Sequence, residues 1–217
     1  MVGARKISRS RYAAAGLLGV CVALQATAGE VSPQAERLAA VIDRLDVEHR
    51  WPAGVHVHWT TGVPDGRAES GSGKHTHCSA FVAAAAKSVG IYILRPPEHP
   101  QLLLANAQYD WLTGGAGAAQ GWERVPTAEG AQDKANHGWF VVAAYRNQRD
   151  EKPGHIAVLR PSTKSLAALH AEGPQITQAG IANYHSTTLR EGFAGHPAAW
   201  SHQEVVYFAH AVDPAAL

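Results

Sequence analysis

The first 28 residues set the conditions under which the rest of this chain folds. Four basic residues fall within the first eleven positions, an apolar run of 12 residues occupies 13–24, and Ala26-Thr27-Ala28 has the small-x-small form of a signal-peptidase site. This order is typical of a secretory signal peptide, and the apolar run is too short to span a bilayer. We therefore expect removal of residues 1–28 and folding of residues 29–217 outside the cytoplasm, in the periplasm or as a secreted protein. A retained N-terminal anchor helix is the alternative.

The remaining chain has the size and composition of one globular domain. Hydrophobic residues make up 46% of the 217-residue sequence, which is too much for a disordered chain. Without four of its 19 Lys and Arg residues, and with all 18 Asp and Glu, the exported chain has a formal charge of −3. It has no basic block and no apolar stretch of membrane-spanning length. We therefore expect no nucleic-acid partner and no membrane span after signal removal.

Export leaves the chain with one cysteine. Cys21 lies in the signal peptide, so Cys78 has no partner in its own chain. Because oxidising compartments favour disulfide pairing, a lone thiol there needs an explanation. It could be a buried small hydrophobic residue, half of an intermolecular bridge, a metal ligand or a nucleophile.

The expected elements run from helices to strands along the chain. Apolar spacing and capping residues predict helices over 33–48, 78–89, 99–112 and 128–136, with a short extended stretch at 51–60 and Gly-rich loops at 61–74 and 113–125. Apolar runs predict strands over 139–145, 155–159, 166–169, 175–179 and 204–210. This order indicates an α+β fold in one domain, with N-terminal helices packed on an antiparallel sheet.

Cys78 is expected to open an alanine-rich helix. A helix N-terminus presents unpaired N–H groups and about half a positive charge, and both stabilise a thiolate, the nucleophilic form of cysteine. The same N–H groups can hold the oxyanion that forms when a carbonyl is attacked. A buried structural cysteine is the alternative at this position.

His155 is the first residue of an expected strand, where its imidazole could deprotonate Cys78 and later protonate a leaving amine. A turn-facing histidine is the alternative. A third polar group would be needed to orient the imidazole. Gln178, near the end of the strand expected at 175–179, is the best placed, and His170 is the alternate third residue. Gln175 and Asn183 are further candidates.

These motifs, in this order, resemble the papain-fold cell-wall hydrolases, namely the NlpC-type peptidases and the related CHAP amidases. The similarity covers roughly residues 74–180: a cysteine opening an Ala-rich helix, then an apolar strand, then an apolar strand introduced by Gly-His, then Ile176-Thr177-Gln178-Ala179-Gly180 on a later strand. The resemblance implies a papain-like fold with Cys78 as nucleophile and His155 as base. Gln178 stands where the family has a polar third residue, often His. The family's usual Asp beside the cysteine helix is absent, since Thr76-His77 precedes Cys78.

The resemblance also implies a substrate. Papain-type enzymes cleave amide bonds, and those of the cell-wall branch act on the peptide stem of peptidoglycan, a polymer that an exported protein meets. We therefore expect a cysteine peptidase or amidase that acts on peptidoglycan peptides without a cofactor. Four tryptophans could line a groove for stem peptide or sugar, although most are expected in the core: Trp59, Trp111, Trp122 and Trp139.

Two other functions could use the same regions of the chain. His56-Val57-His58 places two imidazoles on one face of an extended segment, and His75-Thr76-His77-Cys78 adds three more potential ligands. These residues could bind zinc or copper outside the cytoplasm, although their spacing matches no common zinc template. A non-catalytic cell-wall-binding domain of the same fold is the other alternative.

Overall fold

The fold is built on one sheet of six strands in which every pair is antiparallel, as the α+β prediction requires. The computed structural model describes residues 1, 29–68 and 75–217, so the predicted signal peptide lies outside the described residues, as does part of the loop predicted at 61–74. The strand order is β1-β6-β2-β3-β4-β5. The strands are β1 (Glu123–Val125), β2 (Phe140–Tyr145), β3 (His155–Leu159), β4 (Gln175–Gln178), β5 (Tyr184–Thr188) and β6 (Val206–His210).

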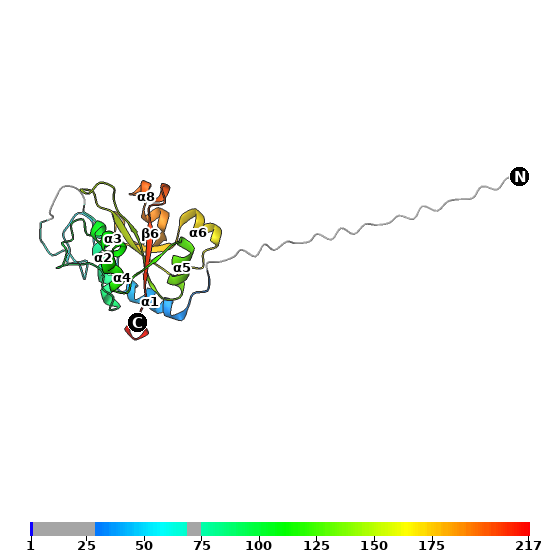
Figure 1. Cartoon of the computed structure of the whole chain (residues 1–217), viewed down its shortest axis with the longest axis horizontal. Helices are drawn as coiled ribbons and strands as arrows, with labels where there is room; N and C mark the ends of the chain where they lie inside the picture. Colours follow the sequence, from blue (N-terminus) through cyan, green and yellow to red (C-terminus); the bar gives the residue numbers. More distant parts are fainter. Residues whose placement is uncertain (2–28, 69–74) are drawn as a thin grey trace.

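Helices cover both faces of this sheet, and Figure 1 shows α2 and α3 on one side of the strands and α5 and α6 on the other. The first face is covered by α1 (Pro33–Asp43), α2 (Cys78–Ser88) and α3 (Leu104–Thr113). The second carries α5 (Ala128–Asn136), α6 (Leu166–Glu172), α7 (Leu189–Gly192) and α8 (Pro197–Ser201). All six residues of β2 are buried, because alternate side chains enter a helical layer on each face. The N-terminal helices pack on the sheet as predicted, and the second layer was not foreseen.

The first helix begins where its capping residues predict. Ser32 accepts a hydrogen bond from the Ala35 amide, and Pro33 occupies the first turn. The helix ends at Asp43 rather than at 48, because Asp46 adopts a left-handed backbone with φ of 56°. The short strand or extended stretch predicted at 51–60 is mostly replaced by turns, and its one β-bridge joins Val57 to Pro64.

The segments around α2 show the limits of periodicity. Helix α2 has the predicted start and is followed by Gly90 with φ of 75°. The next helix begins at Leu104 instead of 99, since Leu103 has a left-handed φ of 55°. The loop predicted at 113–125 contains the short helix α4 (Gly115–Ala119) and strand β1.

The strand predicted at 166–169 is also wrong, because these residues open helix α6. Ser165 caps the helix by accepting a hydrogen bond from the Ala168 amide at 3.2 Å. A short apolar run cannot by itself distinguish a strand from a helix. Strand β5 and helices α7 and α8 were not predicted.

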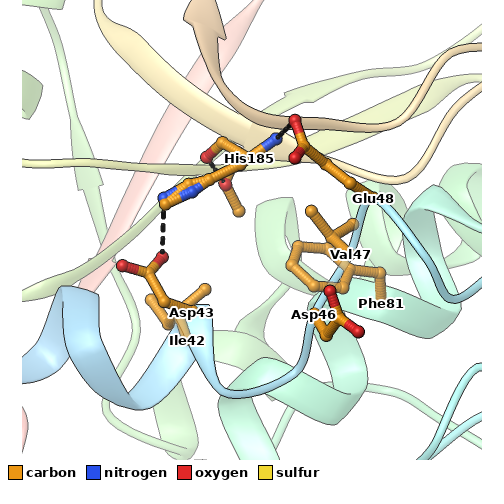
Figure 2. Close-up of a pocket in the computed structure, with 8 residues that line it drawn as sticks. Ile42, Asp43, Asp46, Val47, Glu48, Phe81 and His185 are labelled. Atoms are coloured by element: carbon orange, nitrogen blue, oxygen red, sulfur yellow. Dashed lines mark hydrogen bonds and ion pairs between the residues drawn. The ribbon is translucent and has the colours of Figure 1, made fainter.

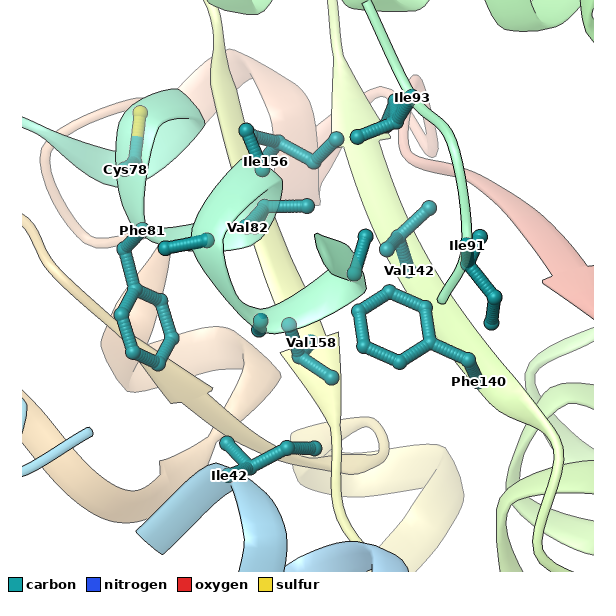
Figure 3. Packing of buried hydrophobic residues seen from close by; sticks show 14 of the residues in the cluster. Ile42, Cys78, Phe81, Val82, Ile91, Ile93, Phe140, Val142, Ile156 and Val158 are labelled. Atoms are coloured by element: carbon teal, nitrogen blue, oxygen red, sulfur yellow. The ribbon is translucent and has the colours of Figure 1, made fainter. Parts of the chain in front are cut away.

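The larger of the two core clusters lies between α2 and the sheet. Phe81 and Val82 of α2 belong to the same cluster as Ile156 and Val158 of β3. Alanines fill the rest of the buried face of α2, and four of the five between 80 and 86 are at most 1% exposed. Figure 3 shows Cys78 at the edge of this cluster, with its sulfur pointing away from the Phe81 ring.

Candidate active site

Cys78 is the first residue of α2, and its side chain is buried with 3% of its surface exposed. His77 precedes it as the N-cap and makes no side-chain capping hydrogen bond. The backbone N–H groups of Ser79 and of Ile156 both lie close enough to stabilise a thiolate on Cys78. The contact with Ile156 places the sulfur at the beginning of β3.

Burial nevertheless controls the ionisation of this thiol. It raises the pKa of Cys78 above its ordinary value, and the N–H groups of Ile156 and Ser79 and the Thr76 side chain only partly oppose the shift. The position at a helix N-terminus had led us to expect a stabilised thiolate. At neutral pH the resting residue is instead a neutral thiol, so a nucleophilic role requires a base to remove its proton.

His155 and Gln178 form a buried pair on the sheet. The imidazole Nε2 and the amide Oε1 are 2.7 Å apart, and both side chains are at most 4% exposed. An amide oxygen only accepts, so Nε2 carries the proton and donates it in this bond. Nδ1 is therefore the unprotonated nitrogen. Burial lowers the pKa of His155 to about 4, despite the opposing effect of Gln178, so the imidazole is neutral at neutral pH.

Strand register brings these two side chains together. Val158 of β3 pairs with Thr177 of β4, which sets Gln178 on the same face as His155 and diagonal to it. A glycine is needed immediately before the histidine. A Cβ on Gly154 would lie 2.1 Å from the Tyr145 carbonyl oxygen and 2.6 Å from Asn106 Oδ1. The Gly-His motif thus places the imidazole where the end of β2 and helix α3 approach the chain closely.

The thiol and the imidazole approach the start of β3 from different sides. Cys78 belongs to the cluster under α2, with Ile156, whereas the His155 ring packs against Phe193, in the cluster on the other face of the sheet. No hydrogen bond joins the thiol to the imidazole in the part of the chain that the structure describes. Their shared neighbour is the first peptide of β3, between His155 and Ile156.

Two residues that no sequence motif indicated enclose the imidazole. The Phe193 ring meets it edge-on at 4.6 Å between ring centroids, and the His196 ring stacks on it at 5.5 Å with 22° between the planes. Burial lowers the pKa of His196 to about 4, with a further contribution from His155. His196 immediately precedes the proline that opens α8, which indicates a helix start but gives no sign of proximity to His155.

The other candidates for a third residue lie elsewhere. His170 is on helix α6, not on a strand, and its Nε2 pairs with Glu129 at 2.6 Å on the surface. Gln175 donates to the Ser186 hydroxyl at 2.8 Å. Asn183 donates to backbone carbonyls of residues 47, 50 and 51, so it fastens the loop after α1 to the sheet. Of the four candidates, Gln178 is the one that contacts His155.

The histidines of the metal hypothesis have separate contacts. His56 pairs with Asp65 at 2.8 Å, His58 with the Thr60 hydroxyl at 2.8 Å, and His77 with the Val55 carbonyl oxygen at 2.8 Å. His75 lies just before α2. Across residues 29–68 and 75–217, no three His, Cys, Asp or Glu side chains are grouped so that they could hold a metal ion.

The four tryptophans have mixed surroundings. Trp122 is buried and donates from its indole nitrogen to the Tyr92 carbonyl oxygen at 2.8 Å. The other three are half-buried, and cations cover two of them: Lys87 and Arg95 approach Trp59, and Lys134 lies 3.8 Å above Trp139. Only Trp122 is a fully buried core residue among the four.

A small cavity of about 90 Å³ lies between α1 and β5 (Figure 2), and neither His155 nor Gln178 lines it. Its acidic residues already have partners. Asp43 pairs with Arg160 and, at 3.5 Å, with His185, while Glu48 accepts from the His185 backbone amide at 3.2 Å. These contacts join α1 to the sheet.

A larger hollow of about 700 Å³ opens among α5, α6, α7 and α8, with Trp200 and Tyr207 in its wall. It lies on the same face of the sheet as the His155 ring.

No model of a known protein family matches the sequence, and no curated protein matches it either. None of the described helices is both long and apolar enough to cross a membrane.

Proposed function

We propose that the protein is an exported cysteine hydrolase with a papain-like arrangement that cleaves amide bonds in peptidoglycan stem peptides. Cys78 is the nucleophile, His155 is the base, and Gln178 orients the base. The observation that carries the proposal is the buried 2.7 Å contact between His155 and Gln178 at the start of β3, the strand end against which the Cys78 thiol lies.

The protonation states support this assignment. Because Gln178 holds the proton on Nε2, the basic lone pair of His155 is on Nδ1, the ring nitrogen nearest its own backbone. The thiol lies against the next peptide N–H, that of Ile156. Both groups are neutral at rest, as a base and its proton donor must be before transfer. The two groups approach β3 from opposite faces of the sheet, so proton transfer requires them to come together when substrate binds.

The reaction follows from these roles. Nδ1 of His155 takes the thiol proton, and the thiolate sulfur bonds to the substrate carbonyl carbon. The N–H groups at the start of α2, including that of Ser79, stabilise the oxyanion. The C–N bond then breaks as the imidazolium protonates the leaving amine, which leaves a thioester on Cys78. Water, deprotonated by His155, attacks the thioester, and the acid product leaves as the thiol regains its proton.

The substrate class rests on two sequence features. The leader predicts export, and the order of motifs between residues 74 and 180 resembles cell-wall hydrolases. Both features indicate a polymer outside the cytoplasm whose peptide stems contain amide bonds.

Purified muropeptides test the proposal directly. Residues 29–217 are incubated with them, and new amine and carboxyl ends are identified by mass spectrometry. We expect cleavage by the unaltered chain and none by Cys78→Ala or His155→Gln, with both variants folded by circular dichroism. Cleavage by Cys78→Ala, or no cleavage by the unaltered chain, would overturn the proposal. A non-catalytic domain of this fold would bind the muropeptides without producing new ends.

The rate should also depend on pH through His155. Since burial holds the pKa of this imidazole at about 4, we expect the rate to fall as the pH drops through about 4, not through the ordinary 6.5. A profile of kcat/KM against pH for the free enzyme measures this. An acidic midpoint near 6.5 would contradict the assignment of His155 as a buried base.

A further inference from the structure

We propose that His196 is a positioning residue for the reaction, whose ring covers the His155 imidazole and holds its plane against Gln178. The inference rests on the proposed function. The observation behind it does not depend on any activity: the rings of His155 and His196 are stacked, with centroids 5.5 Å apart and 22° between their planes.

Three side chains together determine the orientation of the His155 ring. Gln178 binds one edge through Nε2, Phe193 meets the ring at an interplanar angle of 78°, and His196 covers a face. With an edge and a face both contacted, rotation of the ring about its Cβ–Cγ bond would break at least one contact. Gln178 and Phe193 are each at most 3% exposed, whereas His196 is half-buried, so His196 stands between the imidazole and solvent.

Contacts of its backbone and of its ring hold His196 in place over the His155 imidazole. Its backbone amide donates to the Phe193 carbonyl at 2.8 Å, which fixes the two covering residues relative to each other. Its ring also packs on Tyr145, 5.4 Å between centroids, and Tyr145 is the residue opposite His155 in the β2–β3 ladder. His196 is therefore in contact with β2, the strand paired with the one that carries His155.

Few titratable groups face this imidazole. Among the described residues, Tyr145 faces it from β2 and His196 from the turn before α8, while Cys78 lies on the other face of the sheet. The uncharged Gln178 of β4 and Phe193 after α7 complete its surroundings. Burial raises the pKa of Tyr145, with a contribution from Glu204, so this phenol is also neutral at neutral pH. Desolvation is then the main influence that keeps His155 neutral, and His196 supplies part of it by excluding water.

The test compares a variant without a ring at position 196 with one that retains a ring there. His196→Ala opens the face of the imidazole, whereas His196→Phe retains a flat ring of similar size. The pKa of His155 is followed by NMR of its ring C–H groups, and kcat and KM are measured on muropeptides. His202→Ala is the control, because His202 is an exposed histidine at the C-terminal end of α8.

We expect His196→Ala to raise the pKa of His155 from about 4 toward 6.5, by about one unit or more, and to lower kcat more than it changes KM. His196→Phe should leave both nearly unchanged, as should His202→Ala. If His196→Ala does not fold, His196→Gln replaces it, because glutamine is polar and cannot stack as a ring. Equal pKa shifts in the Phe and Ala variants, or no shift in either, would overturn the proposal. The titration requires no substrate, so its outcome stands even if muropeptides are not cleaved.

Discussion

Gln178 accepts a hydrogen bond from Nε2 of His155, and replacements of Gln178 test what this contact contributes. Gln178→Glu places a carboxylate 2.7 Å from Nε2, and an opposite charge favours the protonated imidazole. We expect the pKa of His155 to rise well above 4 in this variant. Gln178→Ala removes the hydrogen bond that partly offsets the effect of burial on the pKa of His155, so this pKa should stay low. The imidazole is then no longer oriented, and kcat should fall by more than about tenfold. NMR titration and steady-state kinetics separate the two effects.

An unchanged pKa of His155 in Gln178→Glu would contradict the contact between the side chain at position 178 and Nε2. Gln175→Glu is the matched control, because Gln175 lies on the same strand and contacts Ser186 instead of the imidazole.

Gly154 shows how closely the backbone is packed beside the base. A methyl group there would lie 2.1 Å from the Tyr145 carbonyl oxygen, and real Cβ atoms do not approach so closely. We expect Gly154→Ala to lower the free energy of unfolding by about 1–3 kcal/mol or more. Urea denaturation measures the change. Gly195→Ala serves as the control, since a Cβ at this position would have no other atom within 4 Å, and it should be neutral or slightly stabilising.

The candidate site was predictable where local sequence determines position. Cys78 at a helix start, His155 after a glycine and Gln178 near a strand end all follow from short motifs, and each has that local position in the structure. The thiol and the imidazole nevertheless lie on different faces of the sheet. Phe193 and His196 were not predictable, because they meet His155 only after the chain has added β5 and α7. The ionisation of Cys78 was misjudged for a related reason: burial depends on the whole fold, and here it outweighs the helix N-terminus.

At the scale of elements, capping side chains were better guides than apolar runs. Ser32 and Pro33 predicted the start of α1, and helix α5 has the predicted bounds, with Thr127 accepting from the Gly130 amide. Residues 166–169 were predicted as a strand from their apolar character, yet Ser165 precedes them as a cap. Polar strands such as β5, with no fully buried residue, give no apolar signal at all.

Helix α6 therefore offers a test of its cap. Ser165→Ala removes the acceptor of the Ala168 amide, and loss of an N-cap costs about 1 kcal/mol. We expect urea denaturation to show this decrease, with Ser165→Asp close to the unaltered chain because an aspartate side chain also accepts. Equal stability of all three chains would mean that α6 does not depend on this cap.

The whole molecule is organised by a sheet buried on both faces. One face packs against α2 and contributes the thiol, and the other packs against α7 and α8 and contributes the stacked imidazoles. The α+β class could be predicted because helices precede strands in the sequence. The second helical layer as a whole could not, since three of its four helices, α6, α7 and α8, have only four to seven residues and little periodicity. Burial of imidazoles in that layer links function to the stability of the entire chain.

This link predicts a loss of stability in mild acid. The pKa values of His155 and His196 are both about 4 in the folded chain, against about 6.5 when unfolded. Below pH 6.5 the unfolded chain binds protons that the folded chain does not accept until the pH approaches 4, so folding is increasingly disfavoured across this window. Above about pH 6.5 both imidazoles are neutral in the folded and in the unfolded chain, so their burial no longer makes the free energy of unfolding depend on pH. The lowered pKa values of Asp65 and Glu129 act at still lower pH.

Urea denaturation between pH 7.5 and 4.5 measures the effect. A proton bound only by the unfolded chain lowers the free energy of unfolding by about 1.4 kcal/mol per pH unit, and the half-buried His196 should contribute less than His155. His155→Gln should flatten the dependence most and His196→Gln less, while exposed His202→Gln should leave it unchanged. A dependence equally steep in His155→Gln would show that other groups bind the protons, and that the base is not buried in the folded chain as the proposed mechanism requires.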